Sequence, residues 1–383
     1  MVAAWFGVKA GVADGTVGCA TLCASMHWLP LILVFALSCG SNSVQVGGTG
    51  GGSATGRDAG TGGSGGAGGN GGAGGSATAG GTGGGEFDAG LSCPPLPQPP
   101  DDAGVVMHPN FATNYTFSEL GPVPGVPGPL GGCVVLQNDR DHLLIAGASE
   151  RPNGGLYRVR VRRNACGHII GWDGTATKIA DTPYIDANIL ELPGNSLLYT
   201  GWNVSQLSQL RLDAGAPLWT TDLTTRGQMG SSAGGLGRVP PWLTAAGQFR
   251  IVGWPDGKWH RVTMTSDAGV YGVAGVVDTG VPALSGGPGG FAYVPLGSAQ
   301  FMRASIILSE WTANEVSVIE VDAQGNPQQG TRRQVFTRFP RPWGAYFEPE
   351  TGDFLFMTWG RPGLPDSVFI VQGFEKPPPV MIE

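Results

Sequence analysis

Residues 305–322, SIILSEWTANEVSVIEVD, contain one complete structural unit. Residues 305–309 are apolar and β-branched, and Val316, Val318 and Val321 alternate with polar neighbours, as in a half-buried strand. The four residues 312–315 between them are polar or small, which suits a tight turn. The segment therefore predicts a β-hairpin whose first strand ends at a Trp.

Similar hairpins recur along the chain. LLYTGW ends at Trp202, FRIVGW at Trp254 and FLFMTW at Trp359, whereas LLIAGA places Ala148 at the same position, so the spacing is 48 to 57 residues. Other strand-like segments precede and follow these hairpins. Four antiparallel strands repeated about every 50 residues are typical of a β-propeller blade. The sequence therefore predicts an all-β fold, a β-propeller in which five blades are counted.

Two blade starts carry a family resemblance. GPGGFAYVP at 287–295 and RPWGAYFEPETGD at 341–353 resemble the blade starts of NHL and SMP-30-like propellers. Those families usually have six blades, so a sixth is the alternative to the five counted. The resemblance to SMP-30-like proteins implies a metal-dependent hydrolase or lactonase. Their first blade begins with a metal-binding Glu, whereas Gly131-Gly132-Cys133 stands at the matching place here.

Residues 1–39 have the features of an export signal. The apolar run 28–37 is too short to span a bilayer and leads directly into Ser38-Cys39-Gly40. This junction resembles the lipobox of bacterial lipoproteins, which implies that Cys39 is lipidated and that the protein reaches the cell envelope, at the outer membrane or cell surface. A plain cleaved signal peptide is the alternative, and Met1 or Met26 could be the true start.

Three further regions follow the signal. Residues 40–90 are almost entirely Gly, Ala, Ser and Thr, a composition that predicts a disordered tether. Residues 91–111 form a Pro-rich lead-in, and residues 112–383 form the propeller domain. Because the last unit lacks a fourth strand, we expect residues 112–120 to pair with residues 367–372 and close the ring.

Charge excludes one class of partner. Charged residues make up 13% of the chain, the net charge is −7, and Lys and Arg form no run. Nucleic-acid binding is therefore not expected, and we expect a monomer. Beyond the lipobox, Cys93, Cys133 and Cys166 allow at most one internal disulfide, for which we favour Cys93–Cys166 because Cys133 belongs at the opposite end of its blade.

The loops at the blade starts supply the candidate site. They should surround the mouth of the central channel and bring together Asp186, Asn188, Glu310 and Trp343. Oxygen ligands of the first three could hold a divalent cation such as Ca²⁺; ordinary capping and solvated roles are the alternative.

The repeated Trp residues have two interpretations. Packing between blades is favoured, because a large ring fills the wedge between neighbouring sheets. A ring of aromatic platforms for a glycan or peptide is the alternative. The favoured function is a membrane-anchored binding module for a protein or glycan ligand, and the SMP-30-like hydrolase is the other.

Overall fold

The hairpin at 305–322 forms as predicted. In the computed structural model, β16 (Ser305–Glu310) pairs with β17 (Glu315–Glu320), so that Ser305 faces Glu320 and Glu310 faces Glu315. Trp311 lies in the turn directly after β16. The structure describes residues 104–202 and 205–377. The signal, the tether, Cys39 and Cys93 lie outside these described residues.

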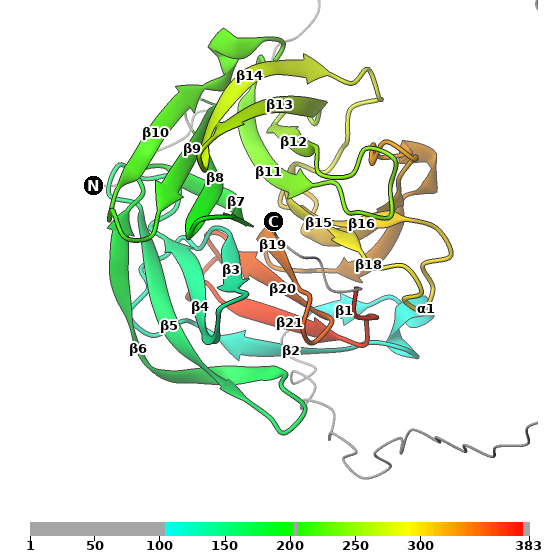
Figure 1. Cartoon of the computed structure of the whole chain (residues 1–383). Coiled ribbons are helices and arrows are strands. Elements are labelled where there is room, and N and C mark those ends of the chain that lie inside the picture. Colours follow the sequence, from blue (N-terminus) through cyan, green and yellow to red (C-terminus); the bar gives the residue numbers. More distant parts are fainter. Residues whose placement is uncertain (1–103, 203–204, 378–383) are drawn as a thin grey trace, which may run out of the picture. The chain divides into compact units, whose positions relative to one another are not determined.

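Five antiparallel sheets form the blades of the propeller (Figure 1). Blade 1 contains β3 (Cys133–Leu136), β4 (Asp139–Gly147), β5 (Gly155–Arg163) and β6 (Ile169–Asp181). Blade 2 contains β7 (Ile185–Leu192), β8 (Ser196–Gly201), β9 (Gln206–Arg211) and β10 (Pro217–Asp222). Blade 3 contains β11 (Ser232–Arg238), β12 (Phe249–Trp254), β13 (Trp259–Asp267) and β14 (Val270–Asp278).

The remaining two blades include strands from the beginning of the domain. Blade 4 contains β15 (Pro288–Val294), β16, β17, β18 (Arg333–Thr337) and, at its outer edge, β1 (Val106–Met107). Blade 5 contains β19 (Pro342–Glu348), β20 (Asp353–Thr358), β21 (Val368–Gln372) and β2 (Thr116–Gly121). The counted five blades are thus confirmed.

The predicted closure is observed with shifted bounds. Thr116 pairs with Gln372 and Phe117 with Val371, so β2 completes the last blade. Residues 112–115 do not belong to this strand, because helix α1 (Pro109–Ala112) precedes it. The expected irregular lead-in also contributes β1, whose Val106 pairs with Thr337 of blade 4. The N-terminal segment therefore joins two neighbouring blades.

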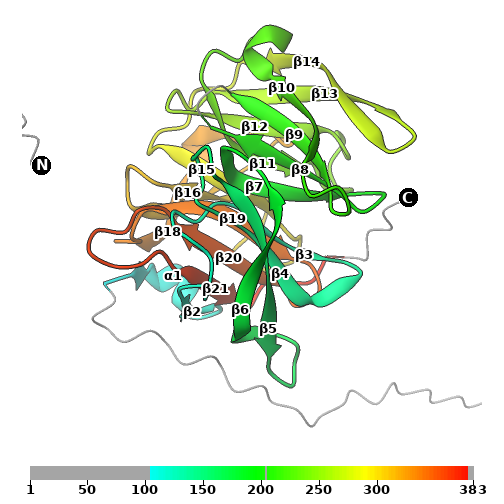
Figure 2. The same ribbon diagram turned by 90° about the vertical axis from the view of Figure 1, so that its left-hand side faces the viewer.

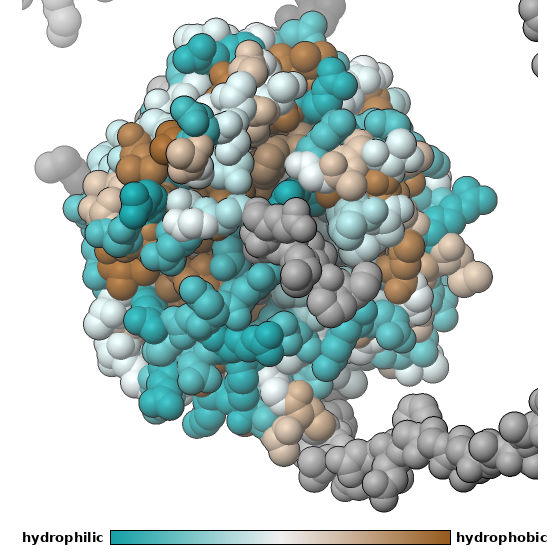
Figure 3. All heavy atoms as spheres, in the orientation of Figure 1, coloured by the Kyte–Doolittle hydropathy of each residue, from teal (hydrophilic) through white to brown (hydrophobic). Residues whose placement is uncertain are grey.

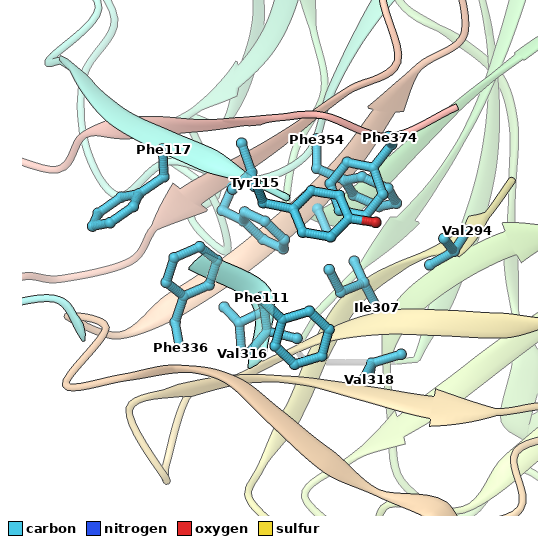
Figure 4. Close-up of a cluster of buried hydrophobic side chains, with 14 of the residues drawn as sticks. Phe111, Tyr115, Phe117, Val294, Ile307, Val316, Val318, Phe336, Phe354 and Phe374 are labelled. Carbon is cyan, nitrogen blue, oxygen red and sulfur yellow. The ribbon is translucent and has the colours of Figure 1, made fainter. Parts of the chain in front are cut away.

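Buried apolar clusters lie at every junction between neighbouring blades of the described residues. The cluster between blades 4 and 5 is rich in Phe and includes Phe111 of α1 and Phe117 of β2 (Figure 4). Phe354 and Phe356 of β20 and Phe336 of β18 are fully buried there. Apolar burial between sheets therefore holds the blades side by side.

Inner strands approach one another closely at the axis. A Cβ added at Gly132 would come within 2.7 Å of Asn188 Cα in the next blade, and one added at Gly290 within 2.5 Å of Ala345 N. Side chains larger than hydrogen do not fit at such distances. The glycines at the blade starts therefore allow the five inner strands to meet.

Two short 3₁₀ helices, η2 (Leu223–Arg226) and η3 (Gln329–Thr331), occupy connections. None of the helices in the described residues is long and apolar enough to cross a membrane. The hairpin of β5 and β6 extends beyond its neighbours (Figure 2). Exposed Arg158, Arg160 and Arg162 alternate with buried residues along β5, and hydrophilic side chains gather over the lower part of the face in Figure 3.

The cysteine expectation is answered in part. Cys166, in the turn after β5, is disulfide-bonded, and Cys133 is a buried free thiol. The expected partner of Cys166, Cys93, lies outside the described residues.

Candidate functional site

A small cavity lies where the second strands of the blades end. It has a volume of about 120 Å³ and is lined by five Trp side chains and one carboxylate. We call it the Trp pocket; its lining residues are Glu150, Trp202, Trp254, Trp311, Trp343 and Trp359. The aligned Trp residues of blades 2 to 5 all reach it. Blade 1, which has Ala148 at the aligned position, contributes Glu150 two residues later.

The Trp rings stand nearly at right angles to their neighbours. Trp254 meets Trp343 at 86° and Trp311 at 87°, with ring centroids 6.0 and 6.4 Å apart. Trp311 meets Trp359 at 76° and 5.7 Å, and its indole N–H donates to the Trp359 carbonyl. Edge-to-face contacts of this kind are a favoured geometry of aromatic pairs. The rings therefore form walls around the cavity.

The aligned Trp residues do not fill the wedges between the sheets as expected; three of them, Trp254, Trp311 and Trp359, contact one another across neighbouring blades. Trp202, Trp254, Trp311 and Trp359 are only partly buried. None of them belongs to the buried clusters between the blades of the described residues. A side chain at the end of a strand projects beyond the wedge between two sheets, which explains why the rings meet at the axis.

Two of the predicted site residues meet beneath the pocket. Trp343 is 2% exposed and Asp186 fully buried, and the Trp343 indole N–H donates to Asp186 Oδ1 over 2.6 Å. The second oxygen, Asp186 Oδ2, is buried without a hydrogen-bond partner. Burial, and after it the negative charge of Glu150, raise the pKa of Asp186 well above its ordinary value. Burial therefore favours the neutral form of Asp186.

Glu150 is the one acidic residue in the pocket lining. Its backbone has φ of 61°, a left-handed conformation that is unfavourable for Glu, and its N–H donates to the Ile185 carbonyl of blade 2. Burial raises the pKa of the Glu150 carboxyl to about 7, although Asp186 and the positive charge of Arg151 act in the opposite direction. Glu150 is thus the member of the acidic pair that changes charge near neutral pH.

Asn188 is placed at the axis, where its polar atoms are occupied. Its Oδ1 accepts from the backbone N–H groups of Leu236 and Phe291, and its Nδ2 donates to the Ala345 carbonyl over 2.7 Å. One side chain of blade 2 thereby connects blades 3, 4 and 5.

Glu310 is also engaged elsewhere. The carboxylate is 1% exposed and accepts two hydrogen bonds from the Arg332 guanidinium. Arg332 also contacts Glu315 at 2.6 Å. Asp186, Asn188 and Glu310 therefore have separate partners, and within residues 104–202 and 205–377 no group of three or more His, Cys, Asp or Glu residues could hold a metal ion.

Sequence reasoning missed Glu150. The signal was the exception in the repeat: where four blades carry a Trp, the first carries Ala148 and a carboxylate shortly after it. Other unsatisfied groups also belong to the lining, because the indole nitrogens of Trp254 and Trp359 are buried without a partner among the described residues.

Comparison with known proteins gives weak matches to propellers. No family model matches the chain, and no curated protein matches it. A luciferin-regenerating enzyme is 10% identical, with a TM-score of 0.38, over 73% of this chain and 91% of that one. Virginiamycin B lyase from Staphylococcus aureus is 14% identical, with a TM-score of 0.34, over 64% of this chain and 68% of that one.

A protein described as a gluconolactonase is also similar. It is 14% identical, with a TM-score of 0.37, over 70% of this chain and 98% of that one. The neighbours thus include a gluconolactonase-like and a lyase propeller. Similarities of this strength assign neither an activity nor a substrate.

Proposed function

We propose that the chain is an envelope-anchored lipoprotein whose β-propeller is a binding module, with the Trp pocket as its ligand site. One observation carries the proposal: four separate blades each direct a Trp to the same small cavity. Partly exposed Trp rings leave apolar surface in contact with water, which a ligand would cover. Asp186, which accepts from Trp343 and neighbours Glu150, adds a buried carboxyl group beneath the pocket, and its Oδ2 has no donor within hydrogen-bond distance.

Ligand binding is tested with the purified domain in a chain that begins at residue 91, which keeps Cys93, the expected disulfide partner of Cys166. A panel of amines, sugars and short peptides is screened by thermal shift and isothermal titration. We expect at least one compound whose binding is lost in Trp254→Ala and Trp311→Ala but kept in the control Trp219→Phe. Trp219 is a suitable control because it lies on the outermost strand of blade 2 and donates to Gln209. If no compound depends on Trp254 and Trp311, the pocket is not a ligand site.

The Trp variants also test the folding role. Because these rings are only partly buried, Trp311→Ala is expected to lower the melting midpoint by less than the roughly 6–20 °C that loss of a fully buried Trp would bring. A larger fall would restore a packing role for the ring.

The anchor is tested separately. Support comes from the lipobox-like junction at Cys39 and the Gly-rich residues 40–90 that follow. The full chain should sediment with membranes, and Cys39→Ala should release it into the soluble fraction. Unchanged membrane association of Cys39→Ala would favour the plain signal peptide or another mode of attachment.

A hydrolase is the second candidate, and the acidic pair favours it. A carboxyl group with a pKa near 7, such as that of Glu150, can both donate and accept a proton at neutral pH. Elemental analysis of the dialysed protein measures bound metal and so tests whether the chain is a metal-dependent hydrolase. Stoichiometric calcium or zinc together with lactone hydrolysis that Glu150→Gln abolishes would make the enzyme the better assignment.

A further inference from the structure

We propose that the Trp pocket binds the trimethylammonium group of a small molecule, with the indole rings as its walls and Glu150 as its counter-charge. This inference rests on the proposed function of the pocket as a ligand site. It adds the chemical class of the ligand.

Ring geometry supplies the first argument. The π-face of an indole carries partial negative charge, and a cation near it is attracted. Neighbouring rings in the Trp pocket stand nearly at right angles to each other, so a bound group would be in contact with aromatic surface on several sides. The rings are those of Trp254, Trp311, Trp343 and Trp359. Enclosures of this kind suit quaternary ammonium groups, whose charge is spread over methyl groups that form no hydrogen bonds.

A cation already lies against one of these rings. The Arg341 guanidinium carbon is 5.0 Å from the Trp311 ring centroid, and the same group donates to the Gly360 carbonyl. Arg341 is not among the residues that line the pocket. The Trp311 ring thus already takes part in one cation–π contact outside the cavity.

Size and polarity narrow the ligand further. A cavity of roughly 150 Å³ accommodates benzene, so a cavity of about 120 Å³ holds one group of about that size, such as trimethylammonium, and excludes larger ligands. A sugar ring would bring several hydroxyl groups into a lining with few polar partners, and each unpaired hydroxyl would weaken binding. A carboxylate group placed against the rings, in the position proposed for the ammonium group, would be repelled by the charge of Glu150.

Charge supplies the last argument. Groups that act on Glu150 are the carboxyl of Asp186, through a hydrogen bond, and the guanidinium of Arg151, and burial raises the pKa of Asp186 well above its ordinary value, in favour of its neutral form. Glu150 is therefore left to carry the negative charge that a bound cation needs. Because the cation favours the charged carboxylate, affinity should rise with pH through about 7.

The test compares choline with 3,3-dimethyl-1-butanol, its neutral isostere, by isothermal titration of the purified domain at pH 8. Choline should bind at least about tenfold more tightly. Glu150→Gln should lower the affinity for choline by about tenfold and remove its dependence on pH. Trp311→Ala should abolish choline binding. The control Trp219→Phe should change neither the affinity nor its pH dependence. Phosphocholine and glycine betaine distinguish a lipid headgroup from a free osmolyte as the source of the group.

Two results would overturn the inference, and they are distinct from failure of the binding module. Equal binding of choline and its isostere would show an apolar pocket that does not select charge. Pocket-dependent binding of sugars or peptides without any binding of choline would confirm a ligand site of another class. Absence of every ligand that depends on Trp254 and Trp311 would instead remove the proposed function together with this inference.

Discussion

Glu150 is an unfavourable residue for the stability of blade 1. Its backbone is held in the left-handed region, and its carboxyl is buried beside a second acid, Asp186. Strain and uncompensated burial of this kind concentrate at functional sites, where binding or chemistry requires them. The residue is therefore better explained by the ligand than by the fold.

The first prediction concerns the pH dependence of stability. The Glu150 carboxyl has a pKa of about 7 in the folded chain, against an ordinary value of 4.5. Between these values the folded state holds more protons than the unfolded state, so the contribution of Glu150 to stability falls as pH rises. Glu150→Gln should therefore be more stable than the natural chain at pH 8, by about 1–3 kcal/mol.

Urea unfolding at pH 5 and pH 8 checks this prediction. The difference between the two proteins should shrink toward pH 5, where Glu150 is protonated in the folded chain. A difference that is the same at both pH values would contradict the buried titration. If Glu150→Gln is more stable than the natural chain and yet binds choline more weakly, its lower affinity does not come from a folding defect.

Asn188 gives the second prediction. Asn188→Ala would leave the Leu236 and Phe291 N–H groups and the Ala345 carbonyl without their partner at the axis. Buried groups without partners cost about 1–3 kcal/mol each. The variant should therefore lose about 3 kcal/mol or more, a fall of roughly 6–12 °C in the melting midpoint. The exposed Asn138 provides the control, because Asn138→Ala should stay within about 0.5 kcal/mol.

For single residues, the sequence predicted which side chains lie near the central channel, but it did not predict their hydrogen-bond partners. Asp186 and Trp343 were expected together, and the structure joins them by a hydrogen bond. Asn188 and Glu310 carry the same kinds of atoms, but their partners come from other blades or from Arg332. Such partners depend on the three-dimensional arrangement of the blades, which strand periodicity does not encode.

Strands with a strong period of two were predictable, and the short elements were not. The hairpin of β16 and β17 follows the alternation of Val and polar residues, and its register is regular throughout. In contrast, β1 has two residues and α1 has four. Elements of that length have no pattern of their own, because their stability comes from the blade against which they pack.

The third prediction concerns the closing strand. Three chains are compared. The chain that begins at Gly104 keeps β1, α1 and β2, the chain that begins at Tyr115 lacks β1 and α1, and the chain that begins at Pro122 also lacks β2. Removal of β1 and α1 exposes part of the Phe-rich cluster and should lower the melting midpoint. Removal of β2 also leaves β21 with a free edge, so cooperative unfolding should be lost. Thermal unfolding followed by circular dichroism tests this prediction. Equal melting curves for the chains that begin at Gly104 and Pro122 would contradict the idea that β2 closes the propeller.

The five-bladed architecture of the molecule follows from the repeated four-stranded unit. Units spaced by about fifty residues cannot bury their apolar faces alone, and the clusters between neighbouring blades show how stacking buries them. The number of blades was therefore predictable by counting hairpins. A ring of the aligned Trp residues was the alternative interpretation of the repeat, but the cavity and its Glu150 were not predictable, because they depend on how far each strand end lies from the common axis.

The order of β1, α1 and β2 along the chain also determines how the protein would respond to mechanical load. When the disulfide of Cys166 is reduced, a pull from the N-terminal side meets the two-residue pairing of β1 with β18 first, then the buried Phe111 of α1, and only afterwards the longer pairing of β2 with β21. Release of residues 104–115 would lengthen the chain by on the order of 40 Å while the five blades stay closed. With Cys93 as the partner of Cys166, the closed disulfide would carry the load directly into blade 1, so this segment would extend before the propeller opens only in the reduced protein.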